Sequence, residues 1–572
     1  MYGMSQPQIQ IEELDSLPII LSLLKKMDIL RLIDTIFIPH KNWSGLSVGE
    51  TVAIWLSYII AHHDHRMCSL EDWVEKRQQI LSDFFCHPIS PKHFTDDRLA
   101  RILDYFSNSE RWNEFECQLN ATIIRVYGVF SDLVRIDMTT ANSDGIVTES
   151  GLLQFGHSKD DPTTPQIKIA LSVLDPLGLP LTVSILPGNT ADDPLYIPVM
   201  DSVIKNTNNQ RLLFVGDCKM CALGTRLHAF LHQMDYLCPL SEVAHPTSEI
   251  IEAVHSFESS NGIMTPIKRE YYTGDEAIIA EAFEKKVMRS AHKDGMHHSW
   301  EERIIYAKSF AHAEKQKAKL DSNLEKSLDE IFSMNERGRG KPVYRSRSEA
   351  EDKIQSVLKS NSILGVISYE IREELTKKTI RAYGNRPKRT EKKISVKVSA
   401  NVNQEAYDAA IEILGWRAYI TNRSEDLLSI EAVVLAYRDQ YVVEHAFHRL
   451  KGKCLSLTPI HIQKDERIDG LVKLLTIPLR ILVVIDKTLQ DSIAQRGENL
   501  SGLFRYNPKK ELVKPKAERI IEYFKGVFVS KVAMGNQYFT SIIGLEEKHM
   551  EILGLLNLSV DIFTAFGVIQ DT

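Results

Sequence analysis

The sequence predicts an α/β fold, because its hydrophobic pattern changes from helical to strand-like near residue 131 and then alternates. Before that point apolar side chains recur at helical spacing, in 17–37, 48–61 and 98–106. After it, the expected elements are a strand, a hairpin, a helix, a strand and a helix, over 133–138, 166–186, 192–204, 212–217 and 222–233. This succession is typical of helices layered on a sheet.

Local signals support two of these elements. The turn signal Asp175-Pro176-Leu177-Gly178 separates the apolar runs 166–174 and 181–186, so these segments predict a hairpin. Asp96 and Asp97 precede the helical run 98–106, where an N-cap residue is expected.

The later part of the chain is less regular. A charged helix is expected over 301–332, a further helix over 467–490, and a small helical unit at the end with helices near 517–524 and 546–556. Two basic stretches, 337–347 and 381–389, each contain a tyrosine. They could follow DNA phosphates and stack bases, or they could be solvated loops.

Bulk properties limit the class of protein. A chain of 572 residues is long enough for about three or four domains. No apolar run is long enough to span a bilayer, and the first residues do not resemble a signal peptide, so a cytoplasmic protein is expected. The net charge of −7 argues against a nucleic-acid partner, but it averages over domains, and local clusters of charge decide more.

Cysteine and histidine patterns indicate no zinc site. The seven cysteines are scattered and fit a reducing compartment. The pair Cys218 and Cys221 lacks a second pair, so a turn after a strand is expected there. The run His62-His63-Asp64-His65 lies at the end of a helical segment, where a structural or DNA-facing role is expected.

Three acidic residues carry the strongest chemical signal. Asp137 lies inside a strand-like apolar run, Asp217 closes another, and Glu444 lies in a helical segment. A carboxylate in an apolar strand is costly unless something pairs with it. Carboxylates brought together from two strands and a helix are suited to bind the metal ions of two-metal phosphoryl transfer. Asp192 and Asp193 are the near rivals of Asp217.

The helical segment 437–451 places useful side chains beside Glu444. Seven residues make about two helical turns, so Tyr437, Glu444 and Lys451 share one face. An adjoining apolar stripe, which could seat the helix on a sheet, comprises Val443, Phe447, Leu450 and Cys454. Taken alone, this segment could equally be a solvated amphipathic helix.

This segment resembles the YREK signature of insertion-sequence DDE transposases, in which tyrosine, arginine, glutamate and lysine recur at fixed spacing. Tyr437, Glu444 and Lys451 match, whereas Gln440 occupies the arginine position, and Arg438 or Arg449 could substitute for it. Other segments resemble the family in the same order along roughly residues 40–490: Asp64-His65-Arg66, Ser158-Lys159-Asp160, Pro187-Gly188-Asn189-Thr190, Thr421-Asn422 and Thr458-Pro459-Ile460-His461.

The resemblance implies an RNase H-like mixed-sheet core interrupted by a large, mainly β insertion and flanked by helical N- and C-terminal regions. Asp137, Asp217 and Glu444 fill the positions of the catalytic, metal-binding acids. The implied organisation is a helical DNA-binding and dimerisation region (1–130), the core in two parts (131–239 and 413–500), the insertion (240–412), and a helical C-terminal unit (501–572).

The resemblance also implies the activity. Two Mg²⁺ or Mn²⁺ ions would serve a DNA transposase that cuts element ends at terminal inverted repeats and joins the 3′ ends to target DNA. The implied partners are double-stranded DNA and a second copy of the chain in a synaptic complex, with no membrane, in a bacterial or archaeal cytosol. Alternatives are a metal-dependent nuclease without strand transfer and a catalytically inactive, domesticated DNA-binding protein.

Four residues are expected to contact DNA. Tyr437, Arg438 and Lys451 are suited to phosphates. Trp416 lies just before the acid-bearing helix, and by resemblance it could stack on a base flipped from the DNA end. A core tryptophan in a strand is the alternative interpretation of Trp416.

Overall fold

The computed structural model describes residues 8–569, except for 159–160, 208–210, 271–275, 337, 339–341, 382–383, 385–386, 505 and 535–536. Arg339 and Arg386, the centres of the two basic stretches, lie outside the described residues, as do Lys159 and Asp160. The chain forms two compact units, one of residues 1–238 with 436–572 and the other of residues 239–435. None of the described helices combines the length and the apolar character needed to cross a membrane.

The N-terminal region is helical, as its hydrophobic spacing predicts. Its helices are α1 (Leu17–Lys26), α2 (Ile29–Ile36), α3 (Val48–His62), α4 (Leu70–Glu75), α5 (Gln78–Phe85), α6 (Asp96–Phe106) and α7 (Ser109–Tyr127), with 3₁₀ turns η1 (Met67–Ser69) and η2 (Pro91–Phe94). The expected cap at Asp96 and Asp97 is wrong: Thr95 is the N-cap residue of α6. The two acids lie in the first turn instead, where the helix dipole favours negative charge.

A mixed sheet forms the centre of the same unit. Its strands, in spatial order, are β4 (Leu179–Pro187), β3 (Gln166–Leu174), β2 (Leu133–Asn142), β5 (Leu213–Val215) and β6 (Asp235–Pro239). Strands β2, β3 and β4 are antiparallel neighbours, so the predicted hairpin is present. Strands β2, β5 and β6 run parallel. The mixed α/β fold class is thereby confirmed.

Helices pack on this sheet. The short turn η3 (Asp193–Leu195) leads into α8 (Tyr196–Asn206), which packs on β3 and β4. Helix α15 (Tyr441–Lys451) packs on β2 and β3, and the long α16 (Asp465–Arg496) packs on β4 and α6. Helix α9 (Leu223–Leu231) packs on α8.

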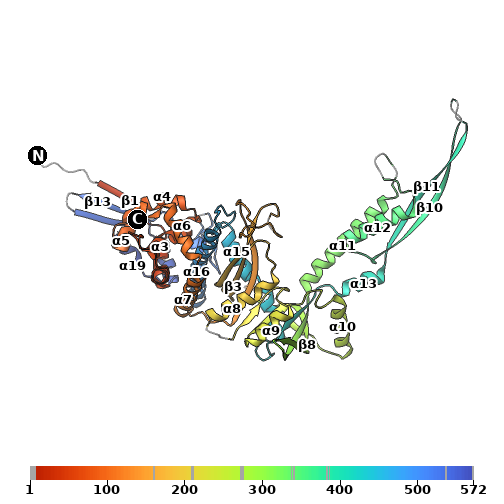
Figure 1. The fold of residues 1–572 in the computed structure, drawn as a ribbon, viewed down its shortest axis with the longest axis horizontal. Helices are drawn as coiled ribbons and strands as arrows, with labels where there is room; N and C mark the ends of the chain where they lie inside the picture. The colour runs from red at the N-terminus through yellow and green to blue at the C-terminus, as the bar shows by residue number, and fades with distance from the viewer. Residues whose placement is uncertain are drawn as a thin grey trace. The chain divides into compact units, whose positions relative to one another are not determined.

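The C-terminal unit contains its expected helices, but it also contains strands that the sequence reasoning missed. Its helices are α17 (Ala517–Tyr523), α18 (Glu547–Leu555) and α19 (Asp561–Thr564). A second sheet joins the two ends of the described chain, in the order β1 (Gln8–Glu13), β13 (Phe528–Met534), β14 (Gln537–Ile543) and β15 (Val568–Ile569). Figure 1 shows the red strand β1 against the blue strand β13.

The second unit combines strands and helices. Its strands β12 (Trp416–Thr421), β9 (Met296–Ser309), β8 (Glu276–Lys293) and β7 (Thr265–Glu270) pair antiparallel in that order. Its helices are α10 (Thr247–Ser259), α11 (Phe310–Ser333), α12 (Arg347–Ser360) and α13 (Gln404–Glu412). The helix expected over 301–332 is therefore wrong at its start, because residues 301–309 belong to β9.

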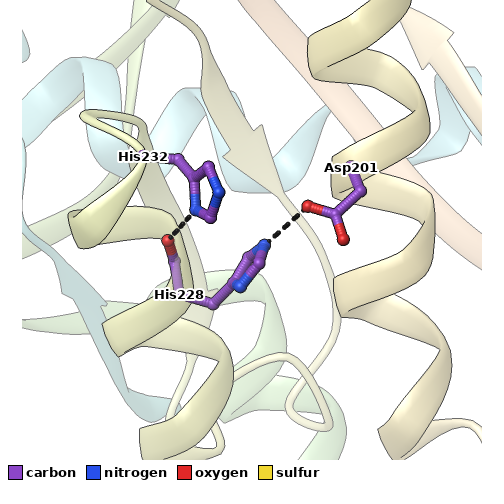
Figure 2. Close-up of side chains that lie close together, drawn as sticks. All are labelled: Asp201, His228 and His232. Carbon is purple, nitrogen blue, oxygen red and sulfur yellow. Dashed lines mark hydrogen bonds and ion pairs between the residues drawn. The ribbon is translucent and has the colours of Figure 1, made fainter. Parts of the chain in front are cut away.

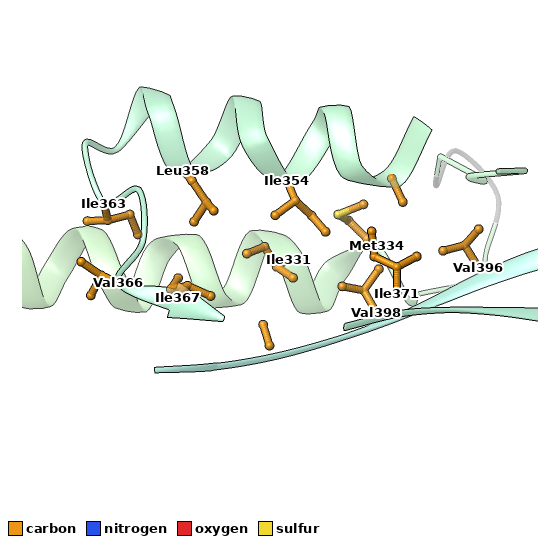
Figure 3. Packing of buried hydrophobic residues seen from close by; sticks show 12 residues of the cluster. Ile331, Met334, Ile354, Leu358, Ile363, Val366, Ile367, Ile371, Val396 and Val398 are labelled. Carbon is orange, nitrogen blue, oxygen red and sulfur yellow. The ribbon is translucent and has the colours of Figure 1, made fainter. Parts of the chain in front are cut away.

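A small hydrophobic core stabilises one part of this unit. The long hairpin of β10 (Ile367–Ile380) and β11 (Arg389–Val402) packs against α11 and α12. Figure 3 shows Ile331 from α11, Ile354 and Leu358 from α12, and Val398 from β11 facing one another between these elements. All four side chains are buried.

Candidate active site

The pairing of β2 with β5 brings Asp137 and Asp217 to neighbouring positions. The two strands run parallel with Arg135 opposite Val215. Continuing this register by two residues sets Asp137 opposite Asp217, which lies just beyond the end of β5. Adjacent strands are about 4.8 Å apart, so the two acids emerge side by side from the sheet.

Tyr196 supplies independent support for this proximity. Its buried hydroxyl donates a hydrogen bond to Oδ1 of Asp217 at 2.7 Å. Burial, followed by the negative charges of Asp217 and Asp137, raises the pKa of the Tyr196 hydroxyl well above its ordinary value. Both carboxylates therefore act on one hydroxyl group, which stays protonated and keeps donating. The sequence reasoning missed Tyr196, since a tyrosine among apolar helix positions gives no signal.

Backbone groups hold the two acids further. The Met138 N–H donates to Oδ1 of Asp137 at 2.8 Å, and the Lys219 N–H donates to Oδ1 of Asp217 at 2.8 Å. Gly216 precedes Asp217 because a side chain does not fit there: an added Cβ would lie 2.9 Å from Cε1 of Tyr196. The loop that carries Asp217 is thus packed directly on Tyr196.

Helix α15 is fixed to β2 at both ends. At its start, the Val442 side chain lies against Gly178 in the β3–β4 turn, 3.2 Å from where a Cβ would stand. At its end, the Lys451 ammonium donates to the Thr140 carbonyl at 3.1 Å. The β3–β4 turn adjoins the beginning of β2, because the Asp175 N–H donates to the Leu133 carbonyl at 3.0 Å. The helix therefore runs along the strand in the same direction.

These anchors set the level of Glu444 along the strand. Glu444 precedes Lys451 by seven helical residues, a rise of about 10 Å. Asp137 precedes Thr140 by three strand residues, also about 10 Å. By this residue count, the level of Glu444 along β2 is expected to be near that of Asp137. Its side chain is exposed, whereas Asp137 and Asp217 are half-buried.

Arg135 shows which face of β2 the helices cover. Its buried guanidinium bonds to Asp175 at 2.5 Å and to the Ala436 carbonyl at 2.7 Å. Alternate residues of a strand share a face. Asp137 therefore lies on the face of β2 that meets the segment leading into α15.

The continuous helix expected over 437–451 is wrong. Tyr437 and Arg438 end α14 (Ile430–Arg438), a turn follows at Asp439 and Gln440, and α15 begins at Tyr441. The helical face shared by Tyr437 and Glu444 is therefore interrupted, while Glu444 and Lys451 remain on one helix. The apolar stripe is confirmed for Val443, Phe447 and Leu450, which are buried, whereas Cys454 lies beyond the end of α15 and is half-buried.

Arg449 cannot take the place of the signature arginine. It is buried and forms ion pairs at 2.8 Å with Asp486 of α16 and with Glu518 of α17. These bonds fasten α15 to the C-terminal helices. Gln440 is the N-cap residue of α15, and its side chain makes no capping hydrogen bond.

The rival acids have other partners. Asp192 pairs with Lys168 at 2.5 Å, and Asp193 pairs with Lys219 at 3.6 Å. The histidine run begins at the last residue of α3, and two of its rings contact the segment after α15: Nδ1 of His63 lies 3.1 Å from the Cys454 carbonyl and Nδ1 of His65 lies 3.2 Å from the Leu455 carbonyl.

Trp416 opens β12 in the second compact unit. It is half-buried, with its ring 6.0 Å from the ring of Phe283 and with the Lys308 ammonium 5.7 Å from its centroid. These contacts are those of a strand residue at the edge of a core, with part of the ring left accessible.

The donor set fits hard divalent cations. Asp137, Asp217 and Glu444 offer only carboxylate oxygens, the ligands that Mg²⁺ and Mn²⁺ prefer. The three do not form a cluster with all ligand atoms within 4.8 Å of one another; among the described residues that condition is met by Asp201, His228 and His232.

Comparisons with known proteins identify the family of the chain. A family described as "Transposase DDE domain" matches residues 156–477, more than half of the chain, and a domain of unknown function (DUF4277) matches residues 9–117. No match was found among curated protein sequences. A solved structure described as a piggyBac transposase synaptic complex with hairpin DNA is similar at a TM-score of 0.34 and 8% identity, over 90% of this chain and 82% of that one. The match to the transposase domain includes Asp217 and Glu444, whereas β2 and Asp137 precede its first residue, and it is this match that shows the family.

Proposed function

The chain belongs to the transposase DDE-domain family, and on that premise we propose that it cuts insertion-sequence ends at terminal inverted repeats and joins the freed 3′ ends to target DNA. The observation that supports this most directly is the hydrogen bond from the buried Tyr196 hydroxyl to Asp217, near enough to Asp137 that its negative charge also raises the pKa of that hydroxyl. Glu444, expected near the same level along β2, is proposed as the third acid.

Asp137, Asp217 and Glu444 would hold two Mg²⁺ or Mn²⁺ ions. Such ions, when bound, activate a water or a 3′-hydroxyl and stabilise the leaving oxygen of a phosphodiester. The protein's own contribution is to fix the acids in place. Tyr196 bonds to Asp217, and the parallel register of β2 and β5, continued beyond its last pair of Arg135 and Val215, would put Asp137 beside it.

Four side chains are proposed to bind DNA. Lys451 is a point charge on the helix of Glu444, suited to a phosphate near the reacting bond. Tyr437 and Arg438 lie at the end of α14, separated from that helix by a turn at residues 439–440, and would contact the DNA backbone. The accessible part of Trp416 would stack on a base at the element end, which Trp416→Ala should impair and Trp416→Phe should largely preserve.

The proposed assembly is a dimer that holds two element ends, because joining both ends to one target needs two active sites. The partners are double-stranded DNA and a second copy of the chain. The proposed setting is the cytosol of a bacterium or an archaeon.

A strand-joining assay tests this function. The purified chain is incubated with Mg²⁺, a supercoiled plasmid and a labelled duplex that ends in the inverted repeat found beside the gene. We expect label to appear in the plasmid and a 3′-hydroxyl at the cut end. Cleavage without joining would instead establish a nuclease, and binding without either step would establish an inactive DNA-binding protein.

A further inference from the structure

Two helices of the sheet-bearing unit carry a cluster of side chains that the proposed cleavage chemistry does not use. Asp201 lies on α8, His228 lies on α9, and His232 follows the last residue of α9. Figure 2 shows the carboxylate and the two rings facing one another. One ligand atom from each side chain lies within 4.8 Å of the other two, a condition that no other trio of His, Cys, Asp or Glu satisfies in the described part of the chain.

The geometry of the two histidines is that of a ligand pair. Residues four apart share one face of a helix, and the ring centroids of His228 and His232 are 4.2 Å apart. Nδ1 of His232 lies 2.9 Å from the His228 carbonyl. Because a carbonyl only accepts, Nδ1 carries the proton, and Nε2 of His232 presents its lone pair. Metal-binding histidines are commonly oriented by such a bond from the other ring nitrogen.

The third donor lies against the buried ring. Oδ1 of Asp201 is 2.8 Å from Nε2 of His228, whose side chain is 9% exposed. An ordinary ion pair would explain the contact between Asp201 and His228. It would not explain why the ring of His232 lies beside them. In a tetrahedral zinc site with bonds of about 2.0–2.1 Å, neighbouring ligand atoms are roughly 3.3 Å apart. A shift of about half an ångström would therefore convert the pair into two ligands of one ion.

The ligand types select the kind of metal. Two imidazole nitrogens and one carboxylate oxygen suit Zn²⁺ and its neighbours Co²⁺, Ni²⁺ and Cu²⁺, whereas Mg²⁺ prefers oxygen ligands alone. His232 is exposed, so an ion can enter from solvent and keep a water in the fourth position.

We propose that Asp201, His228 and His232 bind one zinc-class transition-metal ion that clamps α8 to α9. On binding, the ion replaces the proton on Nε2 of His228, which is released to water. The two helices flank the loop of Asp217: α8 begins with Tyr196, which bonds to Asp217, and α9 begins shortly after that loop. The clamp would brace this loop without contacting the carboxylates that carry out cleavage.

A cobalt titration tests the site. Metal-free full-length protein is titrated with Co²⁺ in excess Mg²⁺, which occupies the carboxylate site, and the visible absorption of bound Co²⁺ is followed. We expect one Co²⁺ per chain, displaced by Zn²⁺. Asp201→Asn and His232→Ala should each weaken binding at least ~10-fold, since the loss of even an outer hydrogen-bond partner costs about 10–100-fold. His232 is exposed and Asp→Asn is isosteric, so both variants should keep the native circular dichroism.

A rival histidine pair provides the control. His292 and His297 face each other across the β8–β9 hairpin with ring centroids 4.9 Å apart, and the double variant His292→Ala/His297→Ala should bind Co²⁺ normally. The proposal is overturned if wild-type protein binds no Co²⁺ in excess Mg²⁺, if Asp201→Asn and His232→Ala bind as wild type does, or if only the double variant loses binding. The readout is metal binding alone, so it is independent of whether the chain cuts DNA.

Discussion

Asp217 lies beyond the end of its strand and is held by a hydrogen bond from Tyr196. Strand β5 ends two residues earlier, and the hydroxyl of Tyr196, the Lys219 N–H and the contact at Gly216 together hold the acid. A protonated donor on one side of a carboxylate leaves the other oxygen for a metal ion. Tyr196 is thus a positioning residue for Asp217.

Removing this hydroxyl tests the positioning role. Tyr196→Phe should lower the cleavage rate and raise the Mg²⁺ concentration needed for half the maximal rate, because Asp217 loses its donor. A hydrogen bond to a charged group contributes about 1.5–3 kcal/mol, so the free energy of unfolding should also fall. Steady-state cleavage at varied Mg²⁺ measures the first effect.

Tyr407→Phe is the matched control. Its hydroxyl donates to Asp321 at 2.5 Å in the other compact unit, so its loss should leave the Mg²⁺ dependence unchanged. Equal Mg²⁺ dependence in Tyr196→Phe and wild type would contradict the role of Tyr196.

At this scale the sequence singles out Asp137, Asp217 and Glu444 as candidates, but it does not reveal the contacts that hold Asp137 and Asp217. Asp137 and Asp217 could be singled out because a carboxylate in or beside an apolar strand is costly to bury unless it is paired. Tyr196 and Arg135 were not recognisable, because their partners lie far away in the chain. Gln440 occupies the arginine position of the signature. Arg449 does not replace that arginine, because its guanidinium is paired with Asp486 and Glu518.

Among the elements, α16 carries a fully buried ion pair. Arg480 bonds to Glu116 of α7 at 2.7 Å, with both side chains 1% exposed, and also contacts the Leu181 carbonyl of β4 at 3.4 Å. Burial raises the pKa of Glu116, which the charge of Arg480 opposes. This pair joins the N-terminal helices to the sheet through α16.

Glu116→Ala should lower the free energy of unfolding by about 3–5 kcal/mol, because it leaves the Arg480 charge buried without its partner. Denaturant unfolding followed by circular dichroism measures the change. Arg31→Ala, which removes an exposed pair with Asp28 on the protein surface, should cause no measurable change. A Glu116→Ala midpoint equal to that of wild type would refute the role given to this pair.

Element boundaries were the weaker part of the sequence prediction, and β9 shows why. Residues 301–309 were expected to be helical because charged residues recur among apolar ones. In the structure Glu302 and Arg303 are both buried in β9, paired across the hairpin with Arg289 and Glu284. Cross-strand pairing of this kind neutralises buried charge, and no pattern within one strand reveals it.

The break at Asp439 and Gln440 has a similar cause. The Ala436 carbonyl, near the end of α14, accepts a hydrogen bond from Arg135, a tertiary contact that the local sequence does not reveal. Periodicity over 437–451 continues through the break, so spacing alone predicts one helix.

For the whole molecule, the division into two compact units makes a prediction about local stability. Ile354 is fully buried in the core formed by α11, α12, β10 and β11. Ile354→Ala should destabilise this region by about 2–5 kcal/mol through loss of buried area and a residual cavity. The free energy of local unfolding differs between regions of one protein. Amide hydrogen exchange should therefore accelerate in α11, α12, β10 and β11 and stay unchanged in α7 and α16.

Hydrogen exchange with mass spectrometry measures this directly. Uniform acceleration across both units would show that they open together, against the expectation. A surface change on the same helix, Lys353→Ala, serves as the control and should leave the exchange pattern as it is.

The sequence also missed how the ends of the chain meet. Strand β1 pairs with β13, over 500 residues later. The alternation in Gln8-Ile9-Gln10-Ile11 was a usable strand signal, but the partner of an edge strand follows from the whole fold.

The claim that Asp137, Asp217 and Glu444 form one metal-dependent active site is tested most directly by cleavage of labelled element ends in Mg²⁺ and Mn²⁺. Asp137→Asn, Asp217→Asn and Glu444→Gln should each lower the cleavage rate at least ~10³-fold, as loss of an essential catalytic group does, while DNA binding is kept. The neighbouring acids provide matched controls: Asp192→Asn and Asp193→Asn should cleave at a rate near that of wild type. Near-wild-type cleavage by any of the first three variants, or a comparable loss in the two controls, would contradict the account.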